Sequence, residues 1–424
     1  MPFKLDRDYA LELDRTDPLA FYRQRFHIPQ HQGKDEIYLC GNSLGLQPRD
    51  TQRLVQEELE DWQRLGVKGH FDGRRPWMPY HEQFTEPTAR LVGAKPVEVV
   101  SMNSLTVNLH LMMTSFYRPT QGRHKLLIER GAFPSDRYAV EAQVRLHGFD
   151  PDESLVELTA KGGDPFIPTE EIEALLAAEG KEIALVLLPG VQYYSGQAFD
   201  LRRITAAGHK AGCRVGFDLA HAVGNLPLQL HDSGADFAVW CNYKYMNAGP
   251  GAVAGCFVHE RHAKAFDLPR LAGWWGHDKS SRFRMGPDFV PMAGAEGWQL
   301  SNPPVLGLAP LLASLDIFEA AGMPALREKS LQLTAYLEFL LKEKLAEHIH
   351  ILTTADPAQR GCQLSLRLHK GRDAARQVFE KLEEAGVTSD WREPDVIRVA
   401  PVPLYNSFMD VFRFVEILEG LVVA

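Results

Sequence analysis

Short apolar runs alternate with polar, helix-like segments between about residue 90 and residue 260. The apolar runs read EVVSM, HKLLIE, IALVLLP, CRVGFD and DFAVW. This alternation is typical of a mostly parallel sheet whose strands are joined by crossover helices. In such sheets the loops that directly follow the strands carry the ligand. The sequence therefore predicts an α/β fold with one site along an edge of its central sheet.

The pattern changes at the proline pair Pro303-Pro304, because a residue that precedes proline is disfavoured in a helix. A long helical stretch then covers residues 308–345, and the strand-like segments HIHILTT, GCQLSLRL and DVIRVAP follow it. We therefore predict a large domain, with the mostly parallel sheet, over residues 56–303 and a smaller α+β domain over residues 304–424. Residues 1–55 are predicted to form an N-terminal segment that associates with the small domain.

Composition narrows the classes of function. The net charge is −9 and Lys and Arg are scattered, which argues against binding to nucleic acid or to an anionic membrane. The N-terminal stretch lacks the apolar region of a secretory signal, and the longest apolar runs are far shorter than the roughly 18 residues that a membrane helix needs. Five cysteines without a CxxC pair fit reduced thiols better than disulfides or zinc. We predict a soluble, cytoplasmic protein with a small-molecule partner and no metal.

Several predicted post-strand loops are polar or aromatic, at residues 103–106, 133–136, 192–195, 218–221 and 242–244. Lys244 follows an apolar strand and precedes a run of small residues, and Asp218 ends the predicted strand before it. A lysine that forms an imine and an aspartate that pairs with a protonated pyridine nitrogen are expected of a pyridoxal phosphate (PLP) site. Two ordinary interpretations remain open, a solvated lysine before a turn and an aspartate that caps a helix near Ala220.

A phosphate group needs N–H donors, and Ser104-Leu105-Thr106 opens a helical stretch directly after a predicted strand. The N-terminus of a helix with a hydroxyl beside it can bind phosphate, although an ordinary Ser/Thr cap has the same pattern. Two other signals are weaker. The glycines of residues 249–255 have the spacing GxGxxxG, which departs from the dinucleotide fingerprint, and His259 and His262 are three residues apart instead of the four of HExxH.

The sequence resembles the kynureninase family of fold-type I PLP enzymes, which have the aspartate-aminotransferase fold. The resemblance covers nearly the whole chain and rests on eight ordered motifs: Tyr38-Leu-Cys-Gly-Asn-Ser-Leu-Gly45, Arg75-Pro-Trp77, Phe133-Pro-Ser-Asp136, Asp218-Leu-Ala-His221, Trp240-Cys-Asn-Tyr-Lys-Tyr245, Gly273-Trp-Trp-Gly-His277, Ser301-Asn-Pro-Pro304 and Arg398-Val-Ala-Pro-Val-Pro-Leu-Tyr-Asn-Ser-Phe408. Cys40 stands where some relatives have Asp. The resemblance implies hydrolysis of L-kynurenine or 3-hydroxy-L-kynurenine to an anthranilate and L-alanine, in tryptophan catabolism.

The resemblance also implies roles for individual residues. Lys244 would hold the cofactor, Phe133 would stack on its ring, and Asp218 would pair with its pyridine nitrogen, with Asp136 and His221 nearby. The phosphate would be held by Leu105, Thr106, Tyr243, Trp274 and Asn302, the last two from the second subunit of a homodimer. Arg398 would bind the α-carboxylate of the substrate, as its planar fork suits. The aryl pocket would be lined by His70, His277 and Ser301, although His81 lies close to His70 in the sequence.

The mechanism that follows has Lys244 as general base at the α-carbon and Asp218 as the group that keeps the pyridine nitrogen protonated. Tyr243 is the candidate for proton delivery, with a simple phosphate hydrogen bond as its alternative role. A class V aminotransferase or a cysteine desulfurase is the nearest other enzyme class, and Cys362 is its one C-terminal candidate nucleophile. A non-catalytic PLP-binding module is the other alternative, but no helix-turn-helix extension or basic arm supports it.

Overall fold

The computed structural model describes residues 3–160 and 165–423. Its central sheet has the strand order β4-β10-β9-β8-β7-β5-β6. The strands are β4 (Val99–Ser101), β5 (Lys125–Glu129), β6 (Leu155–Leu158), β7 (Ile183–Pro189), β8 (Arg214–Asp218), β9 (Phe237–Trp240) and β10 (Gly255–Val258). Strand β10 is antiparallel to both neighbours, and the pairs from β9 to β6 are parallel. The predicted mostly parallel α/β sheet is therefore confirmed.

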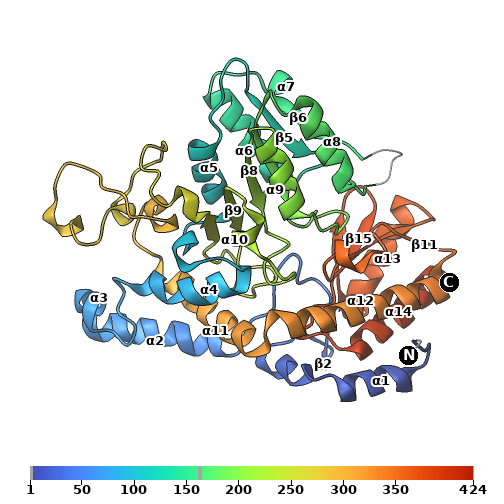
Figure 1. Cartoon of the computed structure of the whole chain (residues 1–424). Helices are drawn as coiled ribbons and strands as arrows, with labels where there is room; N and C mark the ends of the chain where they lie inside the picture. The colour runs from blue at the N-terminus through green and yellow to red at the C-terminus, as the bar shows by residue number, and fades with distance from the viewer. Residues whose placement is uncertain (1–2, 161–164, 424) are drawn as a thin grey trace.

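Helices cover both faces of this sheet (Figure 1). Because side chains alternate along a strand, Leu126 and Ile128 of β5 pack into one core cluster and Leu127 packs into the other. Helices α5 (Leu105–Phe116) and α6 (Pro134–Leu146) contribute to the first cluster, and α8 (Thr169–Glu179) and α9 (Leu201–Lys210) to the second. Shorter helices in this part of the chain are α3 (Gly69–Asp72), α4 (Thr85–Val92), α7 (Pro151–Ser154) and α10 (Leu230–Ser233).

A second sheet lies in the C-terminal part of the chain, with the order β11-β12-β15-β14 and antiparallel pairing throughout. Its strands are β11 (Ile349–Ile351), β12 (Leu364–Leu368), β14 (Asp390–Arg392) and β15 (Val396–Val399). A separate core cluster joins this sheet to helices α12 (Met323–Leu345), α13 (Arg372–Glu384) and α14 (Phe408–Val423). This unit lies on the right in Figure 1, beside the larger sheet.

The N-terminal residues contact the C-terminal unit. Helix α1 (Arg7–Thr16) packs against α14, and β3 (Ile37–Tyr38) pairs in parallel with β13 (Val387–Thr388). Strands β1 (Gln30–His31) and β2 (Lys34–Asp35) form a small hairpin between them in the sequence. Helix α2 (Asp50–Leu65) runs through the predicted boundary at residue 55 and packs along α11 (Val305–Ala321). The two helices lie below the large sheet in Figure 1.

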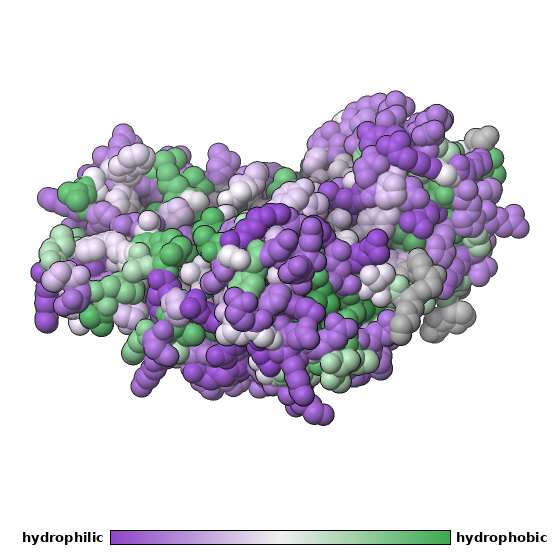
Figure 2. Space-filling view, turned by 90° about the horizontal axis from the view of Figure 1, so that it is seen from above, coloured by the Kyte–Doolittle hydropathy of each residue, from purple (hydrophilic) through white to green (hydrophobic). Residues whose placement is uncertain are grey.

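The surface is mostly hydrophilic, but hydrophobic residues gather on the left half of the face seen in Figure 2. In Figure 1 the segment around residues 263–300 projects on that side. None of the described helices is long and apolar enough to cross a membrane on its own. The pair α11 and α12 reaches that length and composition only together, across a bend of 82°.

Candidate active site

A pocket lies at the edge of the central sheet where the parallel strands end, between the post-strand loops. It brings together eight of the side chains singled out in the sequence: Leu105, Thr106, Phe133, Asp136, Asp218, His221, Tyr243 and Lys244. They come from four loops that the sequence predicts to follow strands. Ser135, Tyr193 and Ala220 of the predicted loops also line the pocket, together with Glu129, Pro189 and Val191, which the sequence analysis did not select.

Lys244 follows β9 and points its amine into this pocket. The Nζ atom lies 3.0 Å from Nε2 of His221 and 5.8 Å from the ring centroid of Phe133. Burial lowers the pKa of Lys244, so the neutral amine that attacks an aldehyde is favoured. Gly45 packs against the loop that carries Lys244, because its N–H donates to the carbonyl oxygen of Tyr243. A Cβ at this position would lie 2.2 Å from the carbonyl oxygen of Lys244, so the close approach requires glycine.

Two carboxyl groups face the pocket: Asp218 is buried and Asp136 is half-buried. Burial raises the pKa of Asp218, and the backbone N–H of Ala220, which donates to its Oδ1 at 2.7 Å, acts in the opposite direction. Burial and the nearby Asp218 raise the pKa of Asp136 well above its ordinary value. Within the described chain, Oδ1 of Asp136 is buried without a hydrogen-bond partner. This unsatisfied acceptor suits a ligand that brings an N–H group or a positive charge into the pocket.

His221 and Tyr243 complete the wall beside Lys244. The Nδ1 atom of His221 is buried without a partner among the described residues, and burial together with the charge of Lys244 lowers the pKa of this ring. Burial raises the pKa of Tyr243, so its hydroxyl keeps its proton in the cofactor-free site. The ring of Tyr243 lies 5.9 Å from the amine of Lys244.

The other end of the pocket is the N-terminus of α5. Ser104 is the N-cap residue of this helix but makes no side-chain capping hydrogen bond. Thr106 Oγ1 lies 2.9 Å from Ser135 Oγ, so two hydroxyl groups from α5 and α6 meet there. The first backbone N–H groups of a helix have no partner within the helix and favour an anion. This geometry fits a phosphate better than the ordinary Ser/Thr cap that the sequence left open.

Glu129 is a pocket residue that the sequence analysis missed. It is the last residue of β5 and is buried, and burial raises its pKa to about 8. The signal was present, because Glu129 ends the apolar run HKLLIE just as Asp218 ends its own strand. The pocket is thus bordered by three carboxyl groups: Glu129 and Asp218 are buried, and Asp136 is half-buried with a buried Oδ1.

Arg398 lies on β15 of the C-terminal unit and is buried. Its Nη1 donates to the carbonyl oxygen of Tyr193 at 2.6 Å, and its Nη2 forms an ion pair with Asp390 of β14. Burial lowers the pKa of Arg398 to about 10. Because Tyr193 lines the pocket, Arg398 connects the C-terminal sheet to the wall of the site.

Five other predicted site residues do not line this pocket: His70, Trp274, His277, Ser301 and Asn302. The ring of Trp274 is 39% exposed and packs against Phe283. His277 is held in its own loop, with Nδ1 accepting from Val290 N–H at 3.0 Å. His70, on α3, packs edge-on against Trp77 and leaves a buried Nδ1 without a partner in the described chain.

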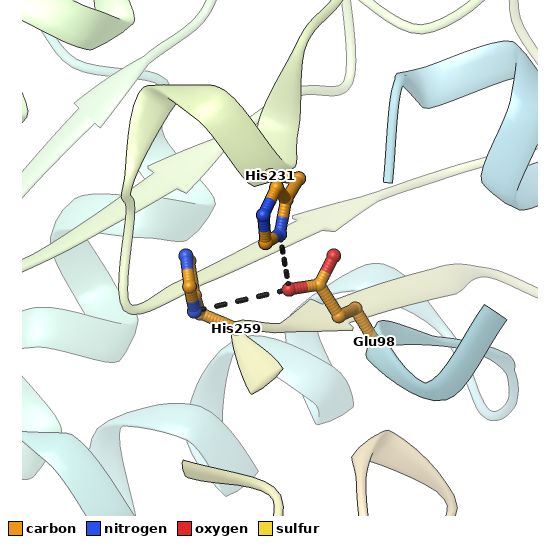
Figure 3. A group of neighbouring side chains, drawn as sticks. All are labelled: Glu98, His231 and His259. Atoms are coloured by element: carbon orange, nitrogen blue, oxygen red, sulfur yellow. Dashed lines mark hydrogen bonds and ion pairs between the residues drawn. The ribbon is translucent and has the colours of Figure 1, made fainter. Parts of the chain in front are cut away.

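Two groups of ionisable side chains lie at the opposite edge of the sheet. Glu98, His231 and His259 form one of them (Figure 3). Glu98 Oε1 accepts from His231 Nδ1 at 2.9 Å and from Glu260 N–H at 2.8 Å, and Glu98 Oε2 accepts from Lys95 N–H at 2.8 Å. These hydrogen bonds supply donors to both oxygens of the Glu98 carboxylate and hold His231 beside it.

Asp236 forms the second group. It is fully buried at the start of β9, and its carboxylate is surrounded by donors from distant parts of the sequence: His209, Arg214, Val215 N–H, Arg261 and His262. Burial alone would raise the pKa of Asp236, but the hydrogen bonds outweigh it and the pKa is strongly lowered. This carboxylate is therefore a structural anion.

Comparison with known proteins agrees with this geometry. The model of the kynureninase C-terminal domain matches residues 326–418. Kynureninases from Xanthomonas campestris pv. campestris and Myxococcus xanthus are each 59% identical to the chain, covering 98% and 99% of it and 98% of each relative. The cystine C–S lyase C-DES, solved with its product cysteine persulfide, has a TM-score of 0.76 at 18% identity, covering 91% of this chain and 97% of that one. A cysteine desulfurase from Thermococcus onnurineus has a TM-score of 0.74 at 16% identity, covering 97% and 98%. These two structures share the fold of the chain, and by its near full-length relatives the chain belongs to the kynureninase family.

Proposed function

We propose that this chain is a PLP-dependent kynureninase that hydrolyses the Cβ–Cγ bond of L-kynurenine or 3-hydroxy-L-kynurenine, yielding an anthranilate and L-alanine. The observation that carries the proposal is the amine of Lys244, held 3.0 Å from His221 and facing the ring of Phe133 in a pocket bordered by acidic groups. The near full-length identity of 59% to named kynureninases supports the same activity. The chain is therefore an enzyme with a small-molecule substrate.

The residues of the pocket fit PLP at four points. Lys244 supplies the amine for covalent attachment, Phe133 supplies a ring to stack on, and Asp218 with Asp136 supplies negative charge for a protonated ring nitrogen. Leu105 and Thr106 at the start of α5 supply donors for the phosphate. When bound, PLP supplies the electron sink that stabilises negative charge at the substrate's α-carbon.

Lys244 then acts as the general base. When its amine is not attached to the cofactor, Lys244 would be free to accept the α-proton of the substrate. Burial lowers the pKa of Lys244, which increases the fraction of this amine that is neutral at a given pH. His221 holds the amine from the side, and Asp218 keeps the proton on the ring nitrogen of the cofactor.

Tyr243 is our candidate for proton delivery. It follows β9 next to Lys244, and its raised pKa keeps a proton on the hydroxyl until a group in the site accepts it. Tyr243→Phe should lower kcat far more than it weakens cofactor binding. Equal effects on kcat and on the dissociation constant of PLP would instead leave Tyr243 as a phosphate ligand.

Arg398 is the proposed ligand of the substrate's α-carboxylate. It is buried, it keeps its charge at physiological pH because its pKa of about 10 is still high, and it is hydrogen-bonded to the pocket residue Tyr193. A planar guanidinium binds a carboxylate through two parallel hydrogen bonds, which also orients the amino acid. His70, His277 and Ser301 are the proposed residues of the aryl pocket.

We propose a homodimer with shared sites, in which Trp274 and Asn302 reach the phosphate of the partner subunit. The segment that carries them has large exposed apolar side chains, at Phe266, Leu271, Trp274, Phe283, Met285, Phe289, Val290 and Leu306. Apolar residues gathered in this way are typical of an interface (Figure 2).

Mixing inactive Lys244→Ala with inactive Trp274→Ala protein should restore part of the activity, because one site of each mixed dimer is then intact. Gel filtration that shows an active monomer would contradict the dimer.

We also propose the division into an N-terminal segment over residues 1–55, a PLP-binding domain over residues 56–303 and a small domain over residues 304–424. The separate core cluster of the C-terminal unit and the contacts of α1 and β3 with it support this division. All five cysteines are buried and free, which fits a reducing compartment, and we propose the cytoplasm.

The desulfurase alternative needs a mobile, reactive thiolate. Cys362 is fully buried, and burial raises its pKa to about 12, so the thiolate is disfavoured.

The first experiment is an absorbance scan of the purified protein, then addition of L-kynurenine with detection of fluorescent anthranilate, and Lys244→Ala as control. A yellow protein that releases anthranilate, with a mutant that does neither, is expected. A yellow protein inert toward both kynurenines would contradict the reaction but keep the cofactor, and a colourless one would contradict both.

A further inference from the structure

Arg398 is held on two sides by groups that belong to different parts of the molecule. In the C-terminal sheet, Asp390 of β14 stands directly opposite Arg398 of β15 and forms an ion pair with its Nη2. On the other side, Nη1 donates to the carbonyl oxygen of Tyr193 in the loop after β7. The ring of Tyr193 in turn meets the ring of Phe133 edge-on, with centroids 5.3 Å apart. The guanidinium is therefore fixed with respect to the residue that faces the cofactor.

The two fixed contacts use Nη1 and Nη2 and leave the Nε–H of the guanidinium without a partner among the described residues. The Nε of Arg398 is buried. A buried N–H without a partner is unfavourable, which makes this edge of the guanidinium ready for an acceptor that the free protein lacks. One oxygen of a carboxylate can accept from this Nε–H while its other oxygen accepts from the second hydrogen of Nη2, beside the hydrogen that faces Asp390.

The charges around Asp390 leave an excess of one positive charge, which suits one carboxylate of a ligand. Asp390 Oδ2 also accepts from Arg392 Nε at 3.1 Å, so this carboxylate lies between two guanidinium groups. Two positive charges and one negative charge leave a net charge of +1. Without Asp390, two adjacent guanidinium groups would repel each other, and the buried one would lose its ion-pair partner.

We propose that Asp390 is a positioning residue for substrate binding: it orients Arg398 so that the Nε edge meets the α-carboxylate of an amino-acid substrate. This inference rests on the proposed role of Arg398 in the kynureninase reaction. Asp390 does not touch the substrate in this arrangement and acts only through Arg398. The alternative is that Asp390 competes with the substrate carboxylate for Arg398, and the two predict opposite signs.

The test measures binding to the PLP-loaded protein by calorimetry, with two probes. L-Alanine carries an α-carboxylate, and 2-aminoacetophenone is an aryl ketone without one. Asp390→Asn should weaken the binding of L-alanine about tenfold or more, the effect of losing a charged hydrogen bond, and leave 2-aminoacetophenone within about twofold. The KM for L-kynurenine should rise more than kcat falls. Asp390→Glu keeps the charge and should lose less affinity than Asp390→Asn.

Two controls separate the outcomes. Glu393→Gln removes an exposed acid that follows β14 directly and pairs with Arg372, and it should change neither probe. Added to Arg398→Lys, Asp390→Asn should cause little further loss, because a positioning residue acts through its partner. Tighter binding of L-alanine, equal weakening of both probes, or additive losses would overturn the inference. A wild-type protein that binds L-alanine but never releases anthranilate would instead contradict the proposed reaction.

Discussion

The two edges of the central sheet each hold buried carboxyl groups, but the number of hydrogen-bond donors around these groups differs between the edges. At the edge where β8 ends, Asp218 has one backbone donor, from Ala220, and burial raises its pKa. At the opposite edge, where β9 begins, Asp236 has donors from two histidines, two arginines and a backbone N–H, and its pKa is strongly lowered. Both side chains are buried, so burial alone does not explain the difference.

The difference shows that the surroundings of a buried carboxylate decide whether it stabilises the fold or remains able to bind a ligand. Asp236 is already saturated with donors, so its charge contributes to the folded state and nothing remains to bind. Asp218 is held by too few donors for a buried anion, and the neighbouring Asp136 has an acceptor atom without a partner. A ligand with a protonated nitrogen relieves this shortage, and perturbed ionisable groups in a pocket are typical of functional sites. This contrast between the two edges can be tested by replacing each carboxylate with the neutral amide of the same shape, Asp by Asn and Glu by Gln.

The largest expected effect on stability is at Asp236. Asp236→Asn replaces a fully buried carboxylate by an amide whose NH2 group faces either the N–H donor of Val215 or those of Arg261 and His262. We therefore expect the free energy of unfolding to fall by about 3–5 kcal/mol. The protein that remains folded should keep its kcat. Urea unfolding followed by tryptophan fluorescence measures the first quantity and the anthranilate assay the second. A variant as stable as the wild type would remove the distinction between the two edges.

Asp218 should respond in the opposite way. Asp218→Asn removes the charge that keeps the ring nitrogen of PLP protonated, and we expect kcat to fall by about 10²–10³-fold, as when one preorganised electrostatic group is lost. The cofactor-free protein should be as stable as the wild type or more stable, because a poorly solvated anion is gone. A large loss of stability with little loss of kcat would make Asp218 a second structural anion.

Glu129 gives the comparison a pH dependence. Its pKa is about 8 in the folded protein and near 4.5 when unfolded, so between these values the folded state binds more protons. Stability therefore falls as pH rises through this window, on the order of 1.4 kcal/mol per pH unit for a single group. Glu129→Gln should flatten the decline in cofactor-free protein between pH 4.5 and 8. Parallel stability curves for variant and wild type would show that folding does not raise the pKa of Glu129.

The sequence predicted one edge better than the other. Lys244 and Asp218 could be found because each follows an apolar run, and strand ends in parallel sheets meet at one edge. Glu129 obeys the same rule but was passed over, since a single charged residue at a strand end also fits a solvated position. Asp236 begins the run DFAVW, yet its partners lie between residues 209 and 262, and no local pattern brings them together.

Other features depend on pairing that a sequence does not contain. Asp390 meets Arg398 only because β14 and β15 pair in one particular register, and a slip of one residue would turn the side chains to opposite faces. Among the glycines of residues 249–255, Gly255 is required by packing, since a Cβ there would lie 2.1 Å from Trp240. Gly249 and Gly251 instead adopt left-handed backbone with nothing near a Cβ, so they serve turns.

The smallest effect is expected at Glu98, the second structural carboxylate at the edge where β9 begins, which we call the amino edge (Figure 3). Glu98→Gln keeps one oxygen acceptor but turns the other position into a donor that faces N–H groups of Lys95 or Glu260. We expect a loss of about 1–3 kcal/mol in the free energy of unfolding, the range for a buried polar group left unsatisfied. Because Glu98 is remote from the pocket, kcat and KM should stay unchanged. A fall in kcat without a fall in stability would mean that the amino edge also contributes to the reaction, and the contrast between the two edges would then hold for Asp236 alone.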